Sequence, residues 1–196
     1  MKKVLLVVLA LSCIAFYSNG MAANQPNGLT ILKQDSGTNI SQMNLTFALS
    51  LTYGSAQTVK FIAPETGWTL QSVQILASDG WNSSDAKLPD LLPFVIEIRD
   101  ANLRLLYHFS DTQLPYFTSS KGIRMTSIEV PDIHLRGDFY VSFYGYRSIA
   151  IAAEQQNATG NSYYFDKLTG ELYEGKVTSS NNQALPVNWL IRVMGQ

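Results

Sequence analysis

Cysteine is almost absent from this chain. The single cysteine, Cys13, lies inside an apolar stretch near the N-terminus. A chain with one cysteine cannot form an internal disulfide, and it lacks the paired thiols of a Cys-x-x-Cys redox or zinc motif. If the N-terminal stretch is removed on export, the remaining chain of about 170 residues has no thiol. Its stability must then come from a packed core, and a chain of that length is long enough to bury one.

Charged side chains are also scarce. They make up 15% of the residues, against roughly 25% in an average soluble domain, and the formal net charge is -1. The chain therefore lacks the basic surface with which proteins bind nucleic acid or anionic membranes. Asparagine, serine, threonine, glutamine and tyrosine must supply most of the polar surface, and this composition is typical of extracellular β-rich proteins.

The motifs of common enzyme sites are missing. The sequence contains no HExxH, no GxSxG and no phosphate-binding glycine-rich loop. Neither histidine, His108 or His134, has metal-ligand spacing around it, so we interpret both as surface or hydrogen-bonded side chains. A glycosidase would need two carboxylates facing each other across a cleft. The candidate acids are Glu97 (with Arg99 on the same strand face), Asp138, Glu154 and Asp166. These side chains are better explained as solvated or ion-paired than as catalytic.

No apolar run is long enough to span a bilayer. The longest, residues 4–17, covers about 14 residues, whereas a membrane-spanning helix needs roughly 20. It follows Lys2 and Lys3 and precedes a cluster of small residues, which is the layout of a secretory signal peptide. We therefore expect a signal peptide over residues 1–23 and a secreted or cell-surface protein without a membrane span. Lipid attachment at Cys13 is the alternative, although this cysteine lies within the apolar run and not at its end.

The rest of the chain is rich in short stretches where apolar and polar residues alternate. The clearest is residues 137–146, GDFYVSFYGY, in which Phe139, Val141 and Phe143 fall on one face and tyrosines on the other. We predict that the phenylalanine face lies in the core. Residues 44–53 alternate in the same way and predict a half-buried strand, with an apolar face made of Leu45, Phe47, Leu49, Leu51 and Tyr53.

About ten such strands, closely spaced turn signals and the lack of an amphipathic helix predict an all-β fold. We expect an arm over residues 24–43 and a single antiparallel two-sheet β-sandwich over residues 44–196. A jelly-roll-like sandwich is favoured over the immunoglobulin-like alternative, which lacks its cysteine and tryptophan landmarks here. A parity change within residues 68–77 predicts a β-bulge near Gln71 and Ser72.

Several strand patterns, taken together, resemble a known kind of module. GDFYVSFYGY, GNSYYF (residues 160–165) and NWLIRV (residues 188–193) are similar to the C-terminal half of jelly-roll modules in secreted and cell-surface proteins of archaea and bacteria. The earlier segments GWTLQSVQIL and FVIEIRDANLRLLY extend the resemblance to residues 57–196. These patterns are structural, so the resemblance implies an exported accessory or binding module and names no ligand.

Aromatic side chains are the candidate ligand-binding residues, because the C–H faces of sugars stack on exposed rings. The candidates are Trp81, in the long connection over residues 78–93, and Tyr116, Tyr140, Tyr144, Tyr146 and Tyr164. The alternative is that these rings fill the sandwich while each hydroxyl finds a partner. We therefore predict a non-catalytic exported module that binds a carbohydrate or another cell-surface ligand. The alternatives are a structural or adhesive cell-envelope protein acting through protein contacts and, less favoured, a hydrolase.

The long connection also suggests a cation. Asp79, Asp85 and Asp90 lie there among further oxygen donors, which are the ligands that calcium prefers. Their spacing is not that of an EF-hand, and aspartates in loops commonly bond to nearby backbone amides instead. A structural calcium ion and a set of Asx-turns are the two interpretations, and no other cofactor is expected.

Overall fold

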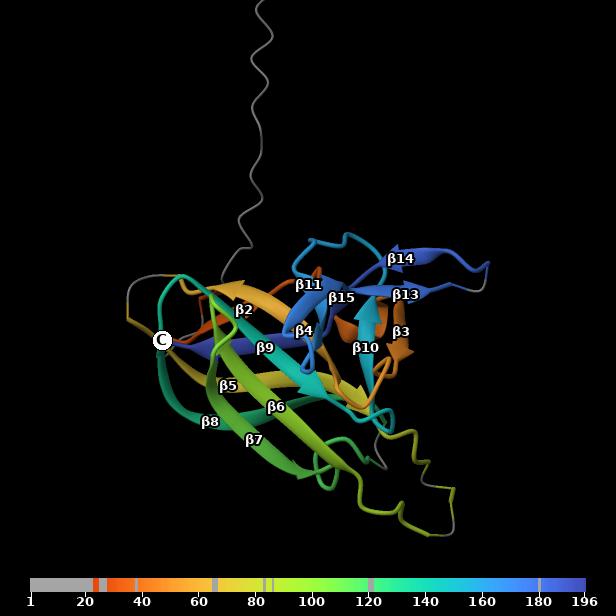
Figure 1. Cartoon of the computed structure of the whole chain (residues 1–196). Helices are drawn as coiled ribbons and strands as arrows, with labels where there is room; N and C mark the ends of the chain where they lie inside the picture. The colour runs from red at the N-terminus through yellow and green to blue at the C-terminus, as the bar shows by residue number, and fades with distance from the viewer. Residues whose placement is uncertain are drawn as a thin grey trace, which may run out of the picture.

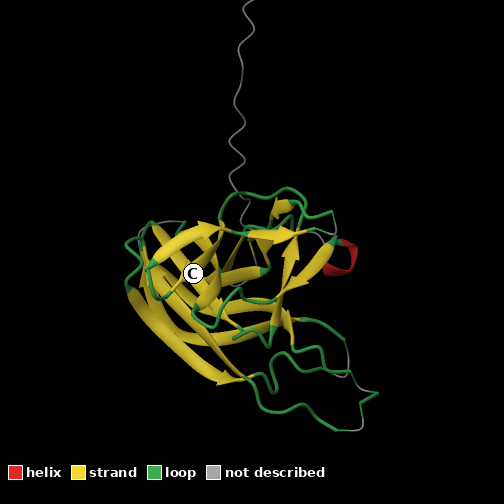
Figure 2. Cartoon of the chain, turned by 45° about the vertical axis from the view of Figure 1, so that its right-hand side comes forward, coloured by secondary structure: helices red, strands yellow, loops and turns green. Residues whose placement is uncertain are grey.

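The computed structural model describes residues 23–24, 28–37, 39–64, 67–82, 84–85, 87–119, 122–179 and 181–196. Cys13 and nearly all of the expected signal peptide over residues 1–23 lie outside these ranges. The described chain is all-β, apart from one 3-10 turn, η1 (Ile40–Gln42) (Figure 2). The strand pairs of the described residues are antiparallel. The predicted antiparallel β-sandwich class is confirmed. The strand arrangement does not distinguish a jelly-roll-like from an immunoglobulin-like sandwich. No helix among the described residues is long and apolar enough to cross a membrane.

One sheet has eight strands. Its main path runs β1 (Ala23–Asn24), β2 (Thr30–Lys33), β16 (Ile191–Gly195), β5 (Trp68–Ser78), β10 (Ala150–Glu154) and β15 (Asn188–Trp189). β3 (Leu45–Ala48) pairs with β10, and β8 (Met125–Leu135) pairs with β5. Because β2 pairs with β16, part of the expected arm over residues 24–43 is a strand of this sheet.

The second sheet has six strands, in the order β12 (Glu171–Glu174), β11 (Ser162–Asp166), β4 (Ser55–Ile62), β9 (Asp138–Tyr144), β6 (Pro93–Asp100) and β7 (Leu105–Thr112). A separate hairpin of β13 (Lys176–Thr178) and β14 (Ala184–Pro186) projects beside the sandwich (Figure 1). β9, the strand with the clearest alternation, therefore lies inside this sheet, between β4 and β6.

The core lies between the two sheets, and it contains the phenylalanine face that the alternation in residues 137–146 predicts to be buried. Phe139, Val141 and Phe143 are all buried there. The Phe139 ring lies 5.5 Å from the Phe61 ring of the same sheet and 5.9 Å from Trp68 of the opposite sheet, measured between centroids. The predicted bulge in β5 is also confirmed, because the pairing of β5 with β8 shifts register between Leu70 and Ser72. The shift keeps Trp68 and Leu70 on the same buried face as Val73 and Ile75.

The prediction for residues 44–53 is wrong. The strand covers only Leu45–Ala48, and its expected inner face is largely exposed: Phe47 at 37%, Leu49 at 48%, Leu51 at 63% and Tyr53 at 68%. The reason is the pairing of β3 with β10, in which Ala48 lies opposite Ile151. Residues directly opposite each other in an antiparallel pair share a face. Since Ile151 is in the core, Ala48 also packs toward it, and the larger apolar residues of the other parity face outward.

Candidate functional site

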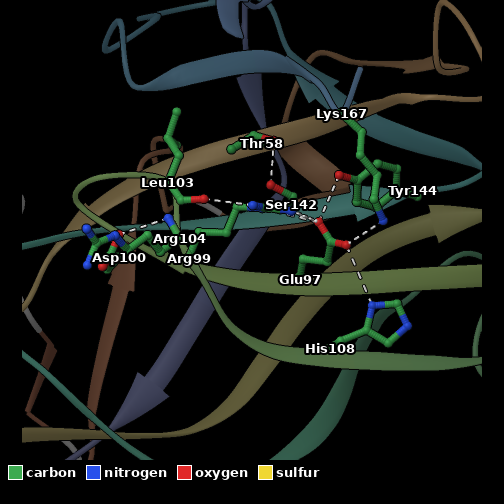
Figure 3. Close-up of polar contacts among 10 residues, drawn as sticks. All are labelled: Thr58, Glu97, Arg99, Asp100, Leu103, Arg104, His108, Ser142, Tyr144 and Lys167. Atoms are coloured by element: carbon green, nitrogen blue, oxygen red, sulfur yellow. Dashed lines mark hydrogen bonds and ion pairs between the residues drawn. The ribbon is translucent and has the colours of Figure 1, made fainter. Parts of the chain in front are cut away.

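A buried carboxylate lies on the outer face of the six-stranded sheet. Its neighbours Ile96 and Ile98 point into the core, so Glu97 points outward, yet its side chain is only 1% exposed. Glu97 Oε2 accepts hydrogen bonds from Arg99 Nη2 at 2.6 Å and from the Tyr144 hydroxyl at 2.9 Å (Figure 3). Two more groups face the other oxygen: Lys167 Nζ donates to Oε1 at 2.9 Å, and His108 Nδ1 lies 3.6 Å from it.

The two cations of this network also cover the sheet. Arg99 extends from β6 over the outer face of the sheet, and its guanidinium carbon lies 4.5 Å from the centroid of the Phe165 ring, which belongs to β11. Its Nη1 donates to the Leu103 carbonyl oxygen at 2.7 Å. Lys167 Nζ lies 5.5 Å from the centre of the Tyr144 ring. Arg99 and Lys167 thus satisfy the carboxylate and shield this part of the outer face from water.

The electrostatics of the network keep Glu97 ionised and Tyr144 protonated near neutral pH. Burial by itself would raise the pKa of Glu97, but hydrogen bonds from Arg99, Lys167 and Tyr144 outweigh it and lower the pKa to about 2. Burial, together with the adjacent carboxylate, raises the pKa of Tyr144 well above its usual value. A general acid or base must change protonation state near the working pH. Glu97 and Tyr144 are therefore suited to structure, and the expected pairing of Glu97 with Arg99 is confirmed.

Two of the six candidate aromatic residues are buried, which corrects the prediction that they contact a ligand. Tyr144 is 1% exposed, because Lys167 and the Tyr146 ring cover it. Tyr164 is 6% exposed and packs edge-on against Trp189, with 5.2 Å between ring centroids, as part of the main core. Both rings lack an open face for a sugar, and both serve in packing.

Three further tyrosines are half-buried and have aromatic neighbours of their own. Tyr116 lies edge-on to Phe94 at 5.4 Å, and its hydroxyl donates to Asp111. Tyr140 lies 6.4 Å from the Tyr163 ring. Tyr146 stacks on Tyr144 with ring centroids 6.2 Å apart, so none of the three stands clear of its surroundings. The tyrosine face of β9 is consequently covered at Tyr144 and only partly open at Tyr140.

Trp81 has a different setting, in the connection between β5 and β6 (residues 79–92) that extends at the lower right of Figure 1. Its ring is half-buried and its Nε1 donates to the Lys87 carbonyl oxygen at 3.0 Å. The Trp81 backbone N–H donates to Asp79 Oδ1 at 3.0 Å, and the Thr118 hydroxyl donates to Asp79 Oδ2. These bonds fix the indole on the surface of an otherwise irregular loop.

The aspartates of this loop bond mainly to their neighbours. Besides the contacts of Asp79, Asp85 Oδ2 accepts the Asn82 N–H at 3.1 Å. The bond at Asp79 is an Asx-turn, and Asp85 likewise bonds to a nearby backbone amide. Within the described ranges, no three His, Cys, Asp or Glu side chains are grouped closely enough to hold a metal ion.

Three neighbouring surface hollows share Gly80, and Trp81 lines two of them. One, of about 500 Å³, is lined by Trp81 together with Asp85, Lys87 and Asp90. A second, of about 330 Å³, lies at Trp81, Asn82, Ser119 and Ile123. The third, of about 480 Å³, is a more apolar groove that shares Asp79, Gly80 and Ile123 with the others and also includes Phe47, Leu49, Arg147 and Ala150. We call this continuous surface the Trp81 site.

The sequence makes Trp81 a candidate residue, but it does not point to the residues of the apolar groove. Phe47 and Leu49 were assigned to the core, because their alternation looks the same whichever face is buried. One signal was available: residues 36–59 contain no charged side chain, which is unusual for a segment that includes an exposed edge strand. Nothing in the sequence indicates that Arg147 lies beside this groove, since its place depends on the position of the turn that carries it.

No protein-family model matches this chain, and no curated protein shows significant similarity to it.

Proposed function

We propose that this chain is an exported, non-catalytic binding module of jelly-roll type, that its ligand is a carbohydrate, and that it binds at the Trp81 site. The observation that carries the proposal is the position of Trp81 between two hollows, each bordered by polar side chains. A sugar ring presents C–H groups on its faces and hydroxyl groups around its edge. An indole ring can stack on the C–H faces, and carboxylate, amide and ammonium groups can hydrogen-bond to the hydroxyl groups.

The polar groups are placed to bond to hydroxyl groups. Asp85, Lys87 and Asp90 border the larger hollow, while Asn82 and Ser119 border the smaller one. Lys87 Nζ is 3.9 Å from Asp90 Oδ1 and both side chains are highly exposed, so this weak pair leaves them free to turn toward a ligand. The fixed indole would orient the sugar, and the exposed side chains of Lys87 and Asp90 would select among its hydroxyl patterns.

A glycan array followed by isothermal titration calorimetry tests this proposal. The wild-type chain is expected to bind at least one glycan, and W81A is expected to weaken that binding at least about tenfold, which corresponds to roughly 1.4 kcal/mol. W81F should retain part of the affinity, because it keeps an aromatic face. Y173A is the matched control: it removes an exposed ring on β12, outside the Trp81 site, and should bind like the wild type. Equal binding by W81A and the wild type would contradict the proposal.

A second candidate function is adhesion through protein contacts at the cell envelope. The observation that favours it is the outward row of Phe47, Leu49, Leu51 and Tyr53 on and after the edge strand β3. Exposed edges without charge or proline promote pairing with another chain, and clustered apolar residues mark interaction surfaces. Light scattering across concentrations tests this function. A monomer at all concentrations, with no change of mass on L49S/L51S substitution, would count against self-association.

A further inference from the structure

The turn that follows β9 has an unusual backbone. Tyr146 and Arg147 both have positive φ values, 46° and 62°. These values lie in the left-handed region, which residues other than glycine and asparagine rarely adopt. The Gly145 carbonyl oxygen closes the turn by accepting the N–H groups of Ser148 at 2.9 Å and Ile149 at 3.0 Å. Two successive residues in this region need support from their surroundings, and such positions are often found at ligand-binding sites.

The support comes from the buried network around Glu97. Tyr146 stacks on Tyr144, whose hydroxyl donates to Glu97. Gly145 is also restricted, since an added Cβ would lie 2.2 Å from the Ile149 carbonyl oxygen. The network therefore holds one side of the turn, and the side chain presented on the other is Arg147.

Arg147 borders the apolar groove of the Trp81 site. The groove is lined on one side by Phe47, Leu49, Ile123 and Ala150, and Arg147 and Ser148 provide the nearby polar groups. Arg147 is exposed, and no partner for its guanidinium occurs in the described part of the chain. Asp79 also borders the groove, but its two carboxylate oxygens already accept hydrogen bonds from Trp81 and Thr118. The groove thus combines an apolar floor with the unpaired guanidinium of Arg147 and the carboxylate of Asp79, whose two oxygens are already hydrogen-bonded.

We propose that the preferred ligand of the Trp81 site is an acidic glycan, whose carboxylate pairs with Arg147 while a neighbouring sugar stacks on Trp81. This inference rests on the proposed carbohydrate function and narrows its ligand class. A guanidinium binds a carboxylate through two parallel hydrogen bonds, which an ammonium group cannot reproduce. Phe47, Leu49 and Ile123 then contact the C–H faces or acyl substituents of the sugar that carries the acid.

The experiment compares acidic oligosaccharides with their carboxyl-reduced forms. The probes are glucuronate-, galacturonate- and mannuronate-containing oligosaccharides, each with and without reduction of the carboxylate to the alcohol, titrated by calorimetry. The wild-type chain is expected to bind at least one acid at least tenfold more tightly than its reduced form, and less tightly as salt rises. R147N should bind the two forms equally, R147K should keep an intermediate preference, and W81A should lose both.

Two controls separate loss of binding from loss of structure. Asparagine tolerates the left-handed backbone, so R147N should unfold at the wild-type temperature or above it. R136N removes another exposed arginine, from the connection between β8 and β9, and should keep the acid preference. If the wild type binds acid and reduced forms equally and both depend on Trp81, the carbohydrate function stands and the role of Arg147 is refuted. If neither form binds and the glycan array is also blank, both proposals are overturned.

Discussion

Replacing Glu97 with glutamine tests the role assigned to the network beneath the turn. The substitution keeps the shape of the side chain but removes its negative charge. The largely buried Arg99 would then face a neutral amide, whereas Lys167 is 54% exposed and keeps contact with water. Losing one member of a buried ion pair commonly costs about 3–5 kcal/mol, because the other charge is left uncompensated.

The lowered pKa of Glu97 leads to a similar free energy. The folded-state pKa is about 2, against 4.5 for a free side chain, and each unit of difference corresponds to about 1.4 kcal/mol. The network thus contributes about 3 kcal/mol to the free energy of unfolding. Because the folded pKa is the lower one, this contribution is complete above pH 4.5 and is lost as the pH falls toward 2. By pH 3, about 2 kcal/mol of it should be gone.

Urea unfolding of the wild type and E97Q at pH 7, 5 and 3 measures this effect. We expect E97Q to be about 3 kcal/mol less stable at pH 7, and the difference to shrink by about 2 kcal/mol at pH 3, when the wild-type carboxylate is losing its advantage. E174Q is the matched control, because Glu174 pairs with Lys176 at 2.7 Å on the surface, where a pair contributes at most about 1 kcal/mol. Parallel pH profiles for the wild type and E97Q would refute the reasoning.

Three further predictions concern single side chains. F143A should lower the free energy of unfolding by about 3–5 kcal/mol, because Phe143 is fully buried in the main core; a loss below 1 kcal/mol would show that this ring is not packed as described. L49S should change the free energy of unfolding by less than about 0.5 kcal/mol in urea. A loss above about 2 kcal/mol would show that Leu49 points inward, as the sequence predicts. R147N should raise the free energy of unfolding by about 1 kcal/mol, since asparagine relieves the left-handed strain at φ 62°; a marked fall in the unfolding temperature by calorimetry would contradict this.

The sequence predicts the interior strands well and the edge strand poorly. In β9 the large apolar residues Phe139, Val141 and Phe143 alternate with polar and tyrosine residues, and pairing on both sides leaves one consistent choice of inner face. In β3 the larger apolar residues face outward, because pairing with β10 places Ala48 and Thr46 opposite the core residues Ile151 and Ala153. Register with a strand a hundred positions away decides the outcome, and local alternation carries no information about it.

The site shows the same division between local and distant information. The Glu97 and Arg99 pair could be predicted from their spacing on one strand face, but Lys167 and Tyr144 join it only through the β11–β12 turn and the pairing of β6 with β9. The loop that carries Trp81 was recognisable from its length and composition. The groove beside it depends on β3, β10 and the turn at Arg147 coming together, which only the fold determines.

The fluorescence of Trp81 reports directly on whether a ligand binds at the Trp81 site. Of the three tryptophans, Trp68 and Trp189 are buried in the core, at 2% and 0% exposed. Trp81 is therefore the tryptophan that a bound ligand can contact directly. Titration with a glycan selected on the array should shift or quench the emission of the wild type in a saturable way and leave W81F without that change. A glycan that binds by calorimetry while the tryptophan emission stays constant would place the site elsewhere and contradict the account.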